Sequence, residues 1–109
     1  MKQFDIWWAD LREPAGRRPV LLLSRNDAYS YLNKLIVAEI TSTVRGIAVE
    51  VGLGVEEGLS RSSVANLDNV HVVPLRRLAG RTGSLPASRH VEVKRALGHA
   101  LAWPELTDA

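Results

Sequence analysis

The chain of 109 residues contains no cysteine. Disulfide bonds, thiolate ligands and cysteine nucleophiles are therefore excluded, which fits a cytoplasmic protein. Aromatic residues are also scarce, at 6% of the chain. No apolar run reaches the roughly 20 residues of a membrane span, and the N-terminal residues lack the apolar segment of a signal peptide. The absences together predict a small protein of the cytoplasm.

The motifs of several common catalytic sites are missing as well. The chain has no His-Glu-x-x-His sequence, no Walker loop and no Gly-x-Ser-x-Gly elbow. Its histidines, His71, His90 and His99, are far apart, and we interpret them as structural or surface residues. Glu56 and Glu57 are interpreted as a solvated turn. The sequence therefore predicts neither a metal site nor a cofactor.

What the chain does contain is an ordinary globular composition with an excess of arginine. Hydrophobic residues make up 46% and charged residues 24%, which fits a single domain over residues 1–109. Residues 61–109 hold seven basic and four acidic side chains, and eleven of the fourteen basic residues are arginine. The planar donor fork of arginine matches phosphate, so the excess favours an anionic partner. A genome of high GC content, whose codons favour arginine, is the alternative explanation.

Short apolar and β-branched runs predict five or six strands before one helix. The C-terminal pattern places Val93, Leu97 and Leu101 on one helical face, with Pro104 ending the helix. This order is typical of a mainly β fold with a C-terminal helix, either a small curved barrel or a sandwich. The expected strands are Ile6–Ala9, Pro19–Ser24, Leu35–Thr41, Ile47–Val51 (after a hairpin at Arg45–Gly46), Ser63–Leu67 and Val70–Val73.

Polar side chains at two strand ends are candidates for the functional site. Arg18 begins one expected strand and Thr41 ends another, so the two side chains converge if these strands are neighbours. A guanidinium and a hydroxyl suit an RNA phosphodiester, whose 2′-hydroxyl supplies the nucleophile. Thr41 is also an ordinary strand residue. Trp7 and Trp8 should point to opposite faces, one into the core and the other toward an interface or a base.

These residues together resemble the MazF/PemK family of toxin–antitoxin endoribonucleases. The likeness runs through IWWADL at 6–11, RPVLLLSRND at 18–27, ITS at 40–42 and GLSRSSVANLDNV at 58–70. It continues through RL at 77–78 and GSL at 83–85 into the final helix, and so covers nearly the whole chain.

The resemblance implies an SH3-like or CcdB-like barrel that forms a homodimer. It implies an enzyme that cuts single-stranded RNA without metal, leaving a 2′,3′-cyclic phosphate and a 5′-hydroxyl, and a MazE-like antitoxin as partner. The catalytic arginine and threonine of the family map onto Arg18 and Thr41. As RNA-binding residues we expect Trp8, Arg17, Ser42, Thr43 and Arg45.

One departure from the family lies in the loop at residues 12–17. Many members carry a Gly-Ser-Glu-Gln segment there, and this loop is shorter. The shortening bears on RNA contact and on the antitoxin response. Two alternatives remain open at this stage: a CcdB-like toxin that binds gyrase without chemistry, and an inactive binding module.

Overall fold

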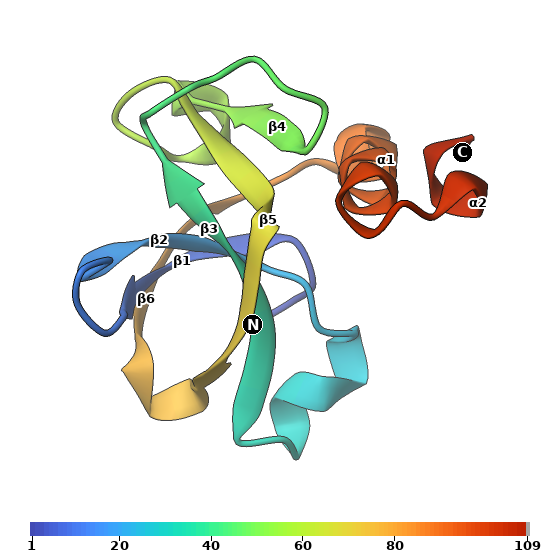
Figure 1. Cartoon of the computed structure of the whole chain (residues 1–109). Coiled ribbons are helices and arrows are strands. Elements are labelled where there is room, and N and C mark those ends of the chain that lie inside the picture. The colour runs from blue at the N-terminus through green and yellow to red at the C-terminus, as the bar shows by residue number, and fades with distance from the viewer. Residues whose placement is uncertain (109) are drawn as a thin grey trace.

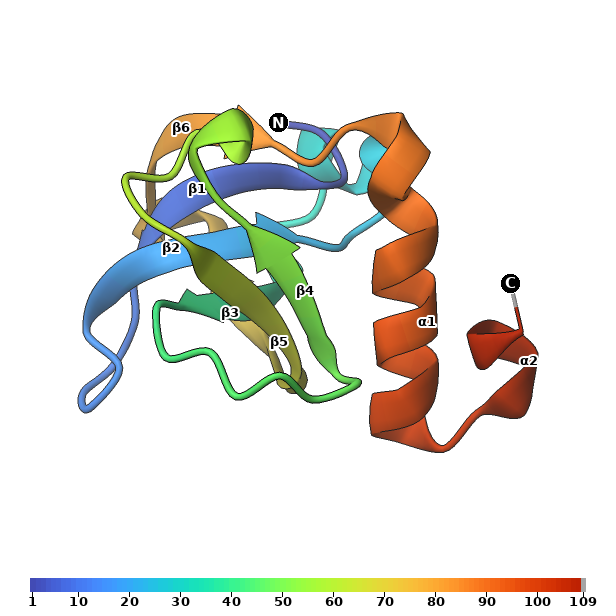
Figure 2. The same ribbon diagram turned by 90° about the horizontal axis from the view of Figure 1, so that it is seen from above.

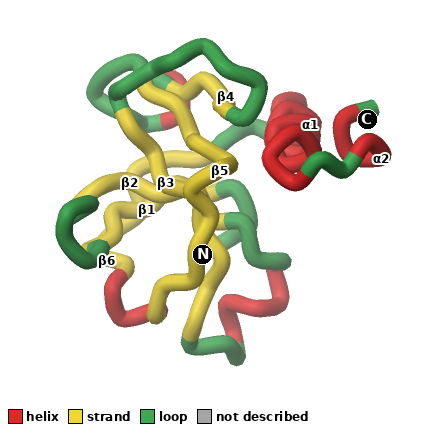
Figure 3. The backbone as a smooth tube through the Cα atoms, viewed as in Figure 1, coloured by secondary structure: helices red, strands yellow, loops and turns green. Residues whose placement is uncertain are grey.

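The computed structural model of the protein describes residues 1–108. Over these residues, six strands precede two helices, and short 3-10 segments connect several of them (Figures 1 and 3). The strands are β1 (Asp5–Asp10), β2 (Arg17–Leu22), β3 (Lys34–Thr41), β4 (Glu50–Leu53), β5 (Ser63–Pro74) and β6 (Leu78–Ser84). The helices are α1 (His90–Leu101) and α2 (Pro104–Thr107), and the 3-10 segments are Asn26–Ser30, Val55–Glu57, Leu75–Arg77 and Ala87–Arg89.

The strands form one antiparallel sheet in the order β4-β5-β3-β2-β1-β6. In Figure 1, β1 and β2 run across the direction of β3 and β5, so the sheet curls into a half-barrel. The edge strands β4 and β6 do not pair with each other, and the Val55–Glu57 turn packs near β6 instead. The predicted mainly β fold with a C-terminal helix is confirmed.

Two strand predictions were wrong because pairing with distant strands decided the outcome. β4 begins at Glu50 and pairs with β5, so Arg45 and Gly46 do not form the expected hairpin with β3. β5 is one long strand rather than two. The expected turn is a bulge, in which the Asp68 N–H donates to Asn66 Oδ1 at 2.9 Å and the register against β3 shifts.

Hydrophobic residues pack on both faces of the curled sheet. The larger cluster includes Ile6, Leu21 and Ile40, and α1 covers it with the buried Val93 and Ala96 (Figure 2). This side-by-side arrangement of α1 with the sheet explains the apolar face predicted for the helix.

A smaller cluster occupies the other face, around Val20 and Leu22 of β2 and Val37 of β3. Trp7 packs against this cluster, whereas Trp8 is 38% exposed, so the expected division between the two rings is confirmed. Successive residues of β2 therefore serve two cores, which explains why its apolar run has no polar alternation.

The C-terminal segment differs from the prediction at its end. Leu101 is 56% exposed, because the helix stops there and Ala102 takes a left-handed conformation. Pro104 begins α2, which folds back onto α1 beside Gly98 (Figure 2). Over residues 1–108, no helix is both long enough and apolar enough to cross a membrane.

Candidate functional site

A cleft of about 400 Å³ opens where β1, β2 and the end of β3 meet the segment that precedes β5. Five of the seven predicted site residues line this cleft, namely Trp8, Arg17, Arg18, Thr41 and Ser42. Arg18 and Thr41 therefore share one cavity, as the argument from strand ends required.

Strand pairing explains why Arg18 and Thr41 meet. β2 pairs with β3 through Val20 opposite Glu39 and Leu21 opposite Ala38. The same antiparallel register, continued for two residues, sets Arg18 opposite Thr41. Because side chains alternate along a strand, Arg18 lies on the same face as Val20 and Glu39. A charged residue at the mouth of a core strand is thus held in place by that strand.

Two acceptors hold the Arg18 guanidinium. Its Nε donates to the carbonyl oxygen of Ala15 at 3.3 Å, within the short loop between β1 and β2. Its Nη1 lies 3.5 Å from Glu39 Oε1. The loop is closed by a Leu11 N–H to Gly16 carbonyl bond of 3.0 Å, so its shortness places a carbonyl beside Arg18. These contacts leave further guanidinium N–H groups for a ligand.

The Thr41 hydroxyl stands at the point where β3 leaves the sheet. Its Oγ1 accepts the backbone N–H of Thr43 at 3.1 Å. A hydroxyl that accepts one bond still has its own proton to donate. Thr41 can therefore offer a donor to an anion in the cleft.

Trp8 and Arg17 form the outer part of the cleft. The Arg17 guanidinium carbon lies 5.6 Å from the Trp8 ring centroid, and its Nη1 lies 3.7 Å from Asp10 Oδ1. The cation over the ring orders both exposed side chains. An aromatic face beside a positive charge is a suitable platform for an unstacked base and its phosphate.

Thr43 and Arg45 do not line the cleft. They belong to the loop after β3, where the Glu50 carboxylate accepts the backbone N–H groups of Arg45 at 3.1 Å and Gly46 at 2.8 Å. This carboxylate holds the loop in place of the predicted hairpin. The role of Thr43 and Arg45 in binding remains a prediction.

Sequence and fold both match one protein family along most of the chain. The family model described as PemK-like, MazF-like toxin of type II toxin-antitoxin system matches residues 2–101. The chain belongs to this family. The resemblance seen in the strand motifs is thereby confirmed.

Individual MazF proteins are similar to this chain over most of their length. Endoribonuclease MazF3 of Mycobacterium tuberculosis is 40% identical over 88 residues, which are 79% of this chain and 85% of that protein. The probable endoribonuclease MazF5 of the same species is 41% identical over 96 residues, 85% of each chain. The solved structure of the Mycobacterium tuberculosis toxin MazF-mt6 superposes with a TM-score of 0.85 at 37% identity, covering 90% of this chain and 96% of that one.

The sequence prediction missed one wall of the cleft that contains Arg18 and Thr41. Ser60 and Arg61 line it from the segment before β5, Ser63 lines it from the start of β5, and Thr82 lines it from β6. The sequence does contain an indication of this wall, because the run Ser60-Arg61-Ser62-Ser63 stands at the start of an expected strand. Only the folding of that segment onto β6 shows that it faces Arg18.

Close backbone packing fixes this wall to β6. The Thr82 hydroxyl donates to the Gly58 carbonyl oxygen at 2.6 Å. Gly58 has a φ of +95°, and a Cβ there would lie 2.0 Å from the Thr82 carbonyl oxygen. A Cβ at Gly83 would lie 1.9 Å from the Glu57 carbonyl oxygen. Glycine is therefore required on both sides of the contact.

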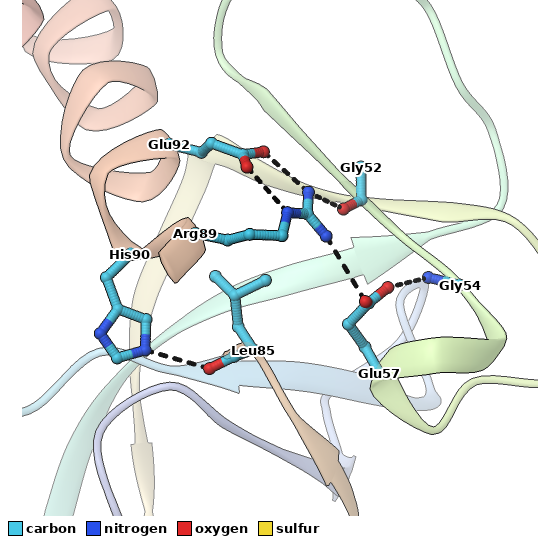
Figure 4. A network of polar contacts seen from close by, with 7 residues as sticks. All are labelled: Gly52, Gly54, Glu57, Leu85, Arg89, His90 and Glu92. Carbon is cyan, nitrogen blue, oxygen red and sulfur yellow. Dashed lines mark hydrogen bonds and ion pairs between the residues drawn. The ribbon is translucent and has the colours of Figure 1, made fainter. Parts of the chain in front are cut away.

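Glu57 is buried rather than solvated, which corrects the sequence interpretation. Its Oε1 accepts the Gly54 N–H at 2.6 Å, and its Oε2 lies 3.5 Å from Arg89 Nη1 (Figure 4). Arg89 also donates to the Gly52 carbonyl oxygen and to both oxygens of Glu92. This network ties the start of α1 to β4 and to the turn that precedes the cleft wall.

A second pocket of about 500 Å³ includes Glu39, the carboxylate that contacts Arg18. Glu39 and His71 line it, and His71 Nε2 is 3.1 Å from Glu39 Oε2. Three arginines line the same pocket: Arg12, Arg76 and Arg77. His71 was predicted only as a structural or surface residue, and the pairing of β3 with β5 places it beside a carboxylate.

The side chains of residues 1–108 form no group of three or more potential metal ligands. The charged groups at the cleft are instead cations, with Glu39 as the carboxylate that contacts Arg18. The site is therefore suited to an anionic ligand.

Proposed function

We propose that this chain is the toxin of a type II toxin–antitoxin system and an endoribonuclease that cuts single-stranded RNA. The observation that carries the proposal is the cleft shared by Arg18 and Thr41, in a chain of the PemK-like, MazF-like family. The 2′-hydroxyl attacks the adjacent phosphorus and the bond to the 5′-oxygen breaks. The products are a 2′,3′-cyclic phosphate and a free 5′-hydroxyl.

In this reaction Arg18 stabilises the crowded phosphorane. Negative charge grows on the non-bridging oxygens, and a preorganised guanidinium placed there lowers the barrier. The Thr41 hydroxyl donates a hydrogen bond to one of the same oxygens. The nucleophile belongs to the substrate and the positive charge to arginine, so the proposed step needs no resident metal or cofactor.

The surrounding residues bind the RNA on either side of the cut. Trp8 stacks on a base, while Arg17 and Ser42 contact the backbone within the cleft. Thr43 and Arg45 extend these contacts along the loop after β3. Sequence specificity in single-stranded RNA comes from base edges and stacking, which this open cleft permits.

The proposed assembly is a homodimer inhibited by a MazE-like antitoxin, in the cytoplasm where its RNA substrate occurs. Ile36 of β3 and Val72 of β5 are paired neighbours, 46% and 56% exposed, and such an apolar pair suits a subunit interface. One similar fold is an endoribonuclease of a mycobacterial species in complex with its cognate antitoxin, with a TM-score of 0.83 at 24% identity. A disordered acidic segment of the antitoxin would cover the basic cleft.

The test is incubation of a long RNA with the protein in EDTA, followed by mapping of the new ends. The proposal expects cuts at a defined short sequence, with cyclic phosphate and 5′-hydroxyl ends, and none with Arg18→Ala. Intact RNA together with binding to gyrase would favour the CcdB-like alternative. Intact RNA without gyrase binding would favour an inactive binding module.

A further inference from the structure

The cleft contains no side chain that readily transfers protons near neutral pH. Its lining, within residues 1–108, has arginines and hydroxyl groups but no Asp, Glu or His. Guanidinium and alcohol groups hold their protons too tightly for this role. RNA cleavage nevertheless needs a proton on the departing 5′-oxygen, because an alkoxide is a poor leaving group. A proton donor must therefore reach the phosphate from beyond the cleft lining.

Glu39 connects Arg18 to such a donor. One Glu39 oxygen is 3.5 Å from Arg18 Nη1, and the other is 3.1 Å from His71 Nε2. The Glu39 side chain is only 19% exposed and lies between these two neighbours. A carboxylate that contacts one imidazole nitrogen orients the ring and leaves the other nitrogen for the substrate.

The two edges of the His71 ring differ in exposure. Nε2 is buried 3.1 Å from Glu39 Oε2 but forms no hydrogen bond of good geometry, while the His71 side chain as a whole is 37% exposed and lines the second pocket. The accessible edge therefore includes the side of Nδ1. The Glu39 carboxylate contacts both groups, so one side chain separates His71 from the Arg18 guanidinium.

We propose that His71 is the general acid of the reaction and that Glu39 is a positioning residue for both His71 and Arg18. This inference rests on the proposed function. His71 Nδ1 gives its proton to the 5′-oxygen as the bond from phosphorus to that oxygen breaks. The 2′-oxygen forms its bond to phosphorus and releases its proton to water, and His71 then regains a proton from solvent.

The charges around His71 come from several elements. Glu39 on β3 contacts it, and Arg18 on β2 contacts the other oxygen of Glu39. Arg12 from the loop after β1 and Arg76 and Arg77 from the segment after β5 line the same pocket as His71. The arginines hold the phosphate that follows the cut on this side. Glu39 keeps a negative group beside the imidazole in an otherwise positive pocket.

The experiment compares two linkages at the mapped cleavage site of a short synthetic RNA. One RNA has the natural 5′-oxygen, and the other has sulfur in that bridging position. A thiolate leaves without protonation, so loss of a general acid slows only the oxygen substrate. His71→Gln should lower the rate on oxygen by about 100-fold or more, and on sulfur by less than about 10-fold.

Glu39→Gln gives a different expected pattern. Because Glu39 orients Arg18 as well as His71, this variant should slow both linkages, and Glu39→Asp should restore part of the rate. The exposed His99→Gln and Glu105→Gln are matched controls that should leave the rates unchanged.

Equal losses of His71→Gln on oxygen and sulfur, or no loss on either, would overturn the assignment of His71. Such a result with active wild-type protein leaves the proposed function intact. Failure of the wild type on both linkages would instead refute the proposed function itself. Circular dichroism and thermal unfolding of each variant show whether the fold is retained.

Discussion

The Thr41 side-chain oxygen accepts the backbone N–H of Thr43 at 3.1 Å, and this bond fixes the hydroxyl where β3 ends in the cleft. The hydroxyl is thus aimed by its own chain, two residues further on. The side chain needs no neighbour from another strand to set its direction.

Thr41→Val should lower RNA cleavage by about 10-fold to 100-fold, since one hydrogen-bond donor to the developing charge is lost. Valine keeps the β-branched shape, so the strand should still form. Thr41→Ser keeps the hydroxyl and should retain most of the activity. Single-turnover rates of the wild type and the two variants measure this effect. Equal rates for the wild type and Thr41→Val would show that the Thr41 hydroxyl has no catalytic role.

Arg18→Ala should abolish detectable cleavage while the protein stays folded, because the guanidinium is the main cation held at the cleft by Ala15 and Glu39. Arg18→Lys keeps the charge but loses the planar fork, and should remain at least about 100-fold slower than the wild type. Cleavage assays beside circular dichroism distinguish these outcomes. Wild-type cutting by either variant contradicts the assignment.

Local patterns were enough to predict that Arg18 and Thr41 lie in one cleft. Each stands at the end of an apolar run, and an antiparallel partner brings such ends together. The first three strands could be predicted because β-branched and apolar residues dominate them. The helix followed from its single apolar face.

The remaining features depend on contacts that no local pattern encodes. β6 contains Gly80 and Gly83, which weaken the strand signal, and it forms because β1 needs a partner on its free edge. His71 meets Glu39 only through the pairing of β5 with β3, whose register shifts directly before Glu39. Register is set by tertiary packing, so a lone histidine in the sequence carried no sign of its neighbour.

Gly58→Ala and Gly83→Ala should each destabilise the fold by more than about 3 kcal/mol. Ordinary overpacking costs about 1–3 kcal/mol, and here the added carbon would overlap backbone oxygens at 2.0 Å and 1.9 Å. Urea unfolding measures the loss. Gly52→Ala is the control, because a Cβ at Gly52 meets nothing within 4 Å. A loss as large in the control would show that the tight contact is not the cause.

Arg89→Met should lower the unfolding free energy by about 3 kcal/mol, because the buried Glu57 carboxylate loses the cation beside it. Methionine retains the apolar stem of arginine, so the lost charge dominates the change. Lys94→Met removes a charge from an exposed position of the same helix and should change stability little. Urea unfolding near neutral pH compares the two variants, and equal small effects would contradict the role assigned to Arg89.

Arg89→Met should also make the unfolding free energy depend less on pH in the acid range. The Arg89 guanidinium lowers the pKa of Glu92 below its ordinary value of 4.5, chiefly by hydrogen bonding to the carboxylate. A lowered folded pKa adds stability that is complete above the unfolded pKa and disappears as pH falls through the folded pKa. The wild type should therefore lose this contribution below the ordinary pKa of Glu92, whereas Arg89→Met has none to lose. If the unfolding free energies of the wild type and Arg89→Met fall equally with decreasing pH, the Arg89–Glu92 pair does not couple folding to pH.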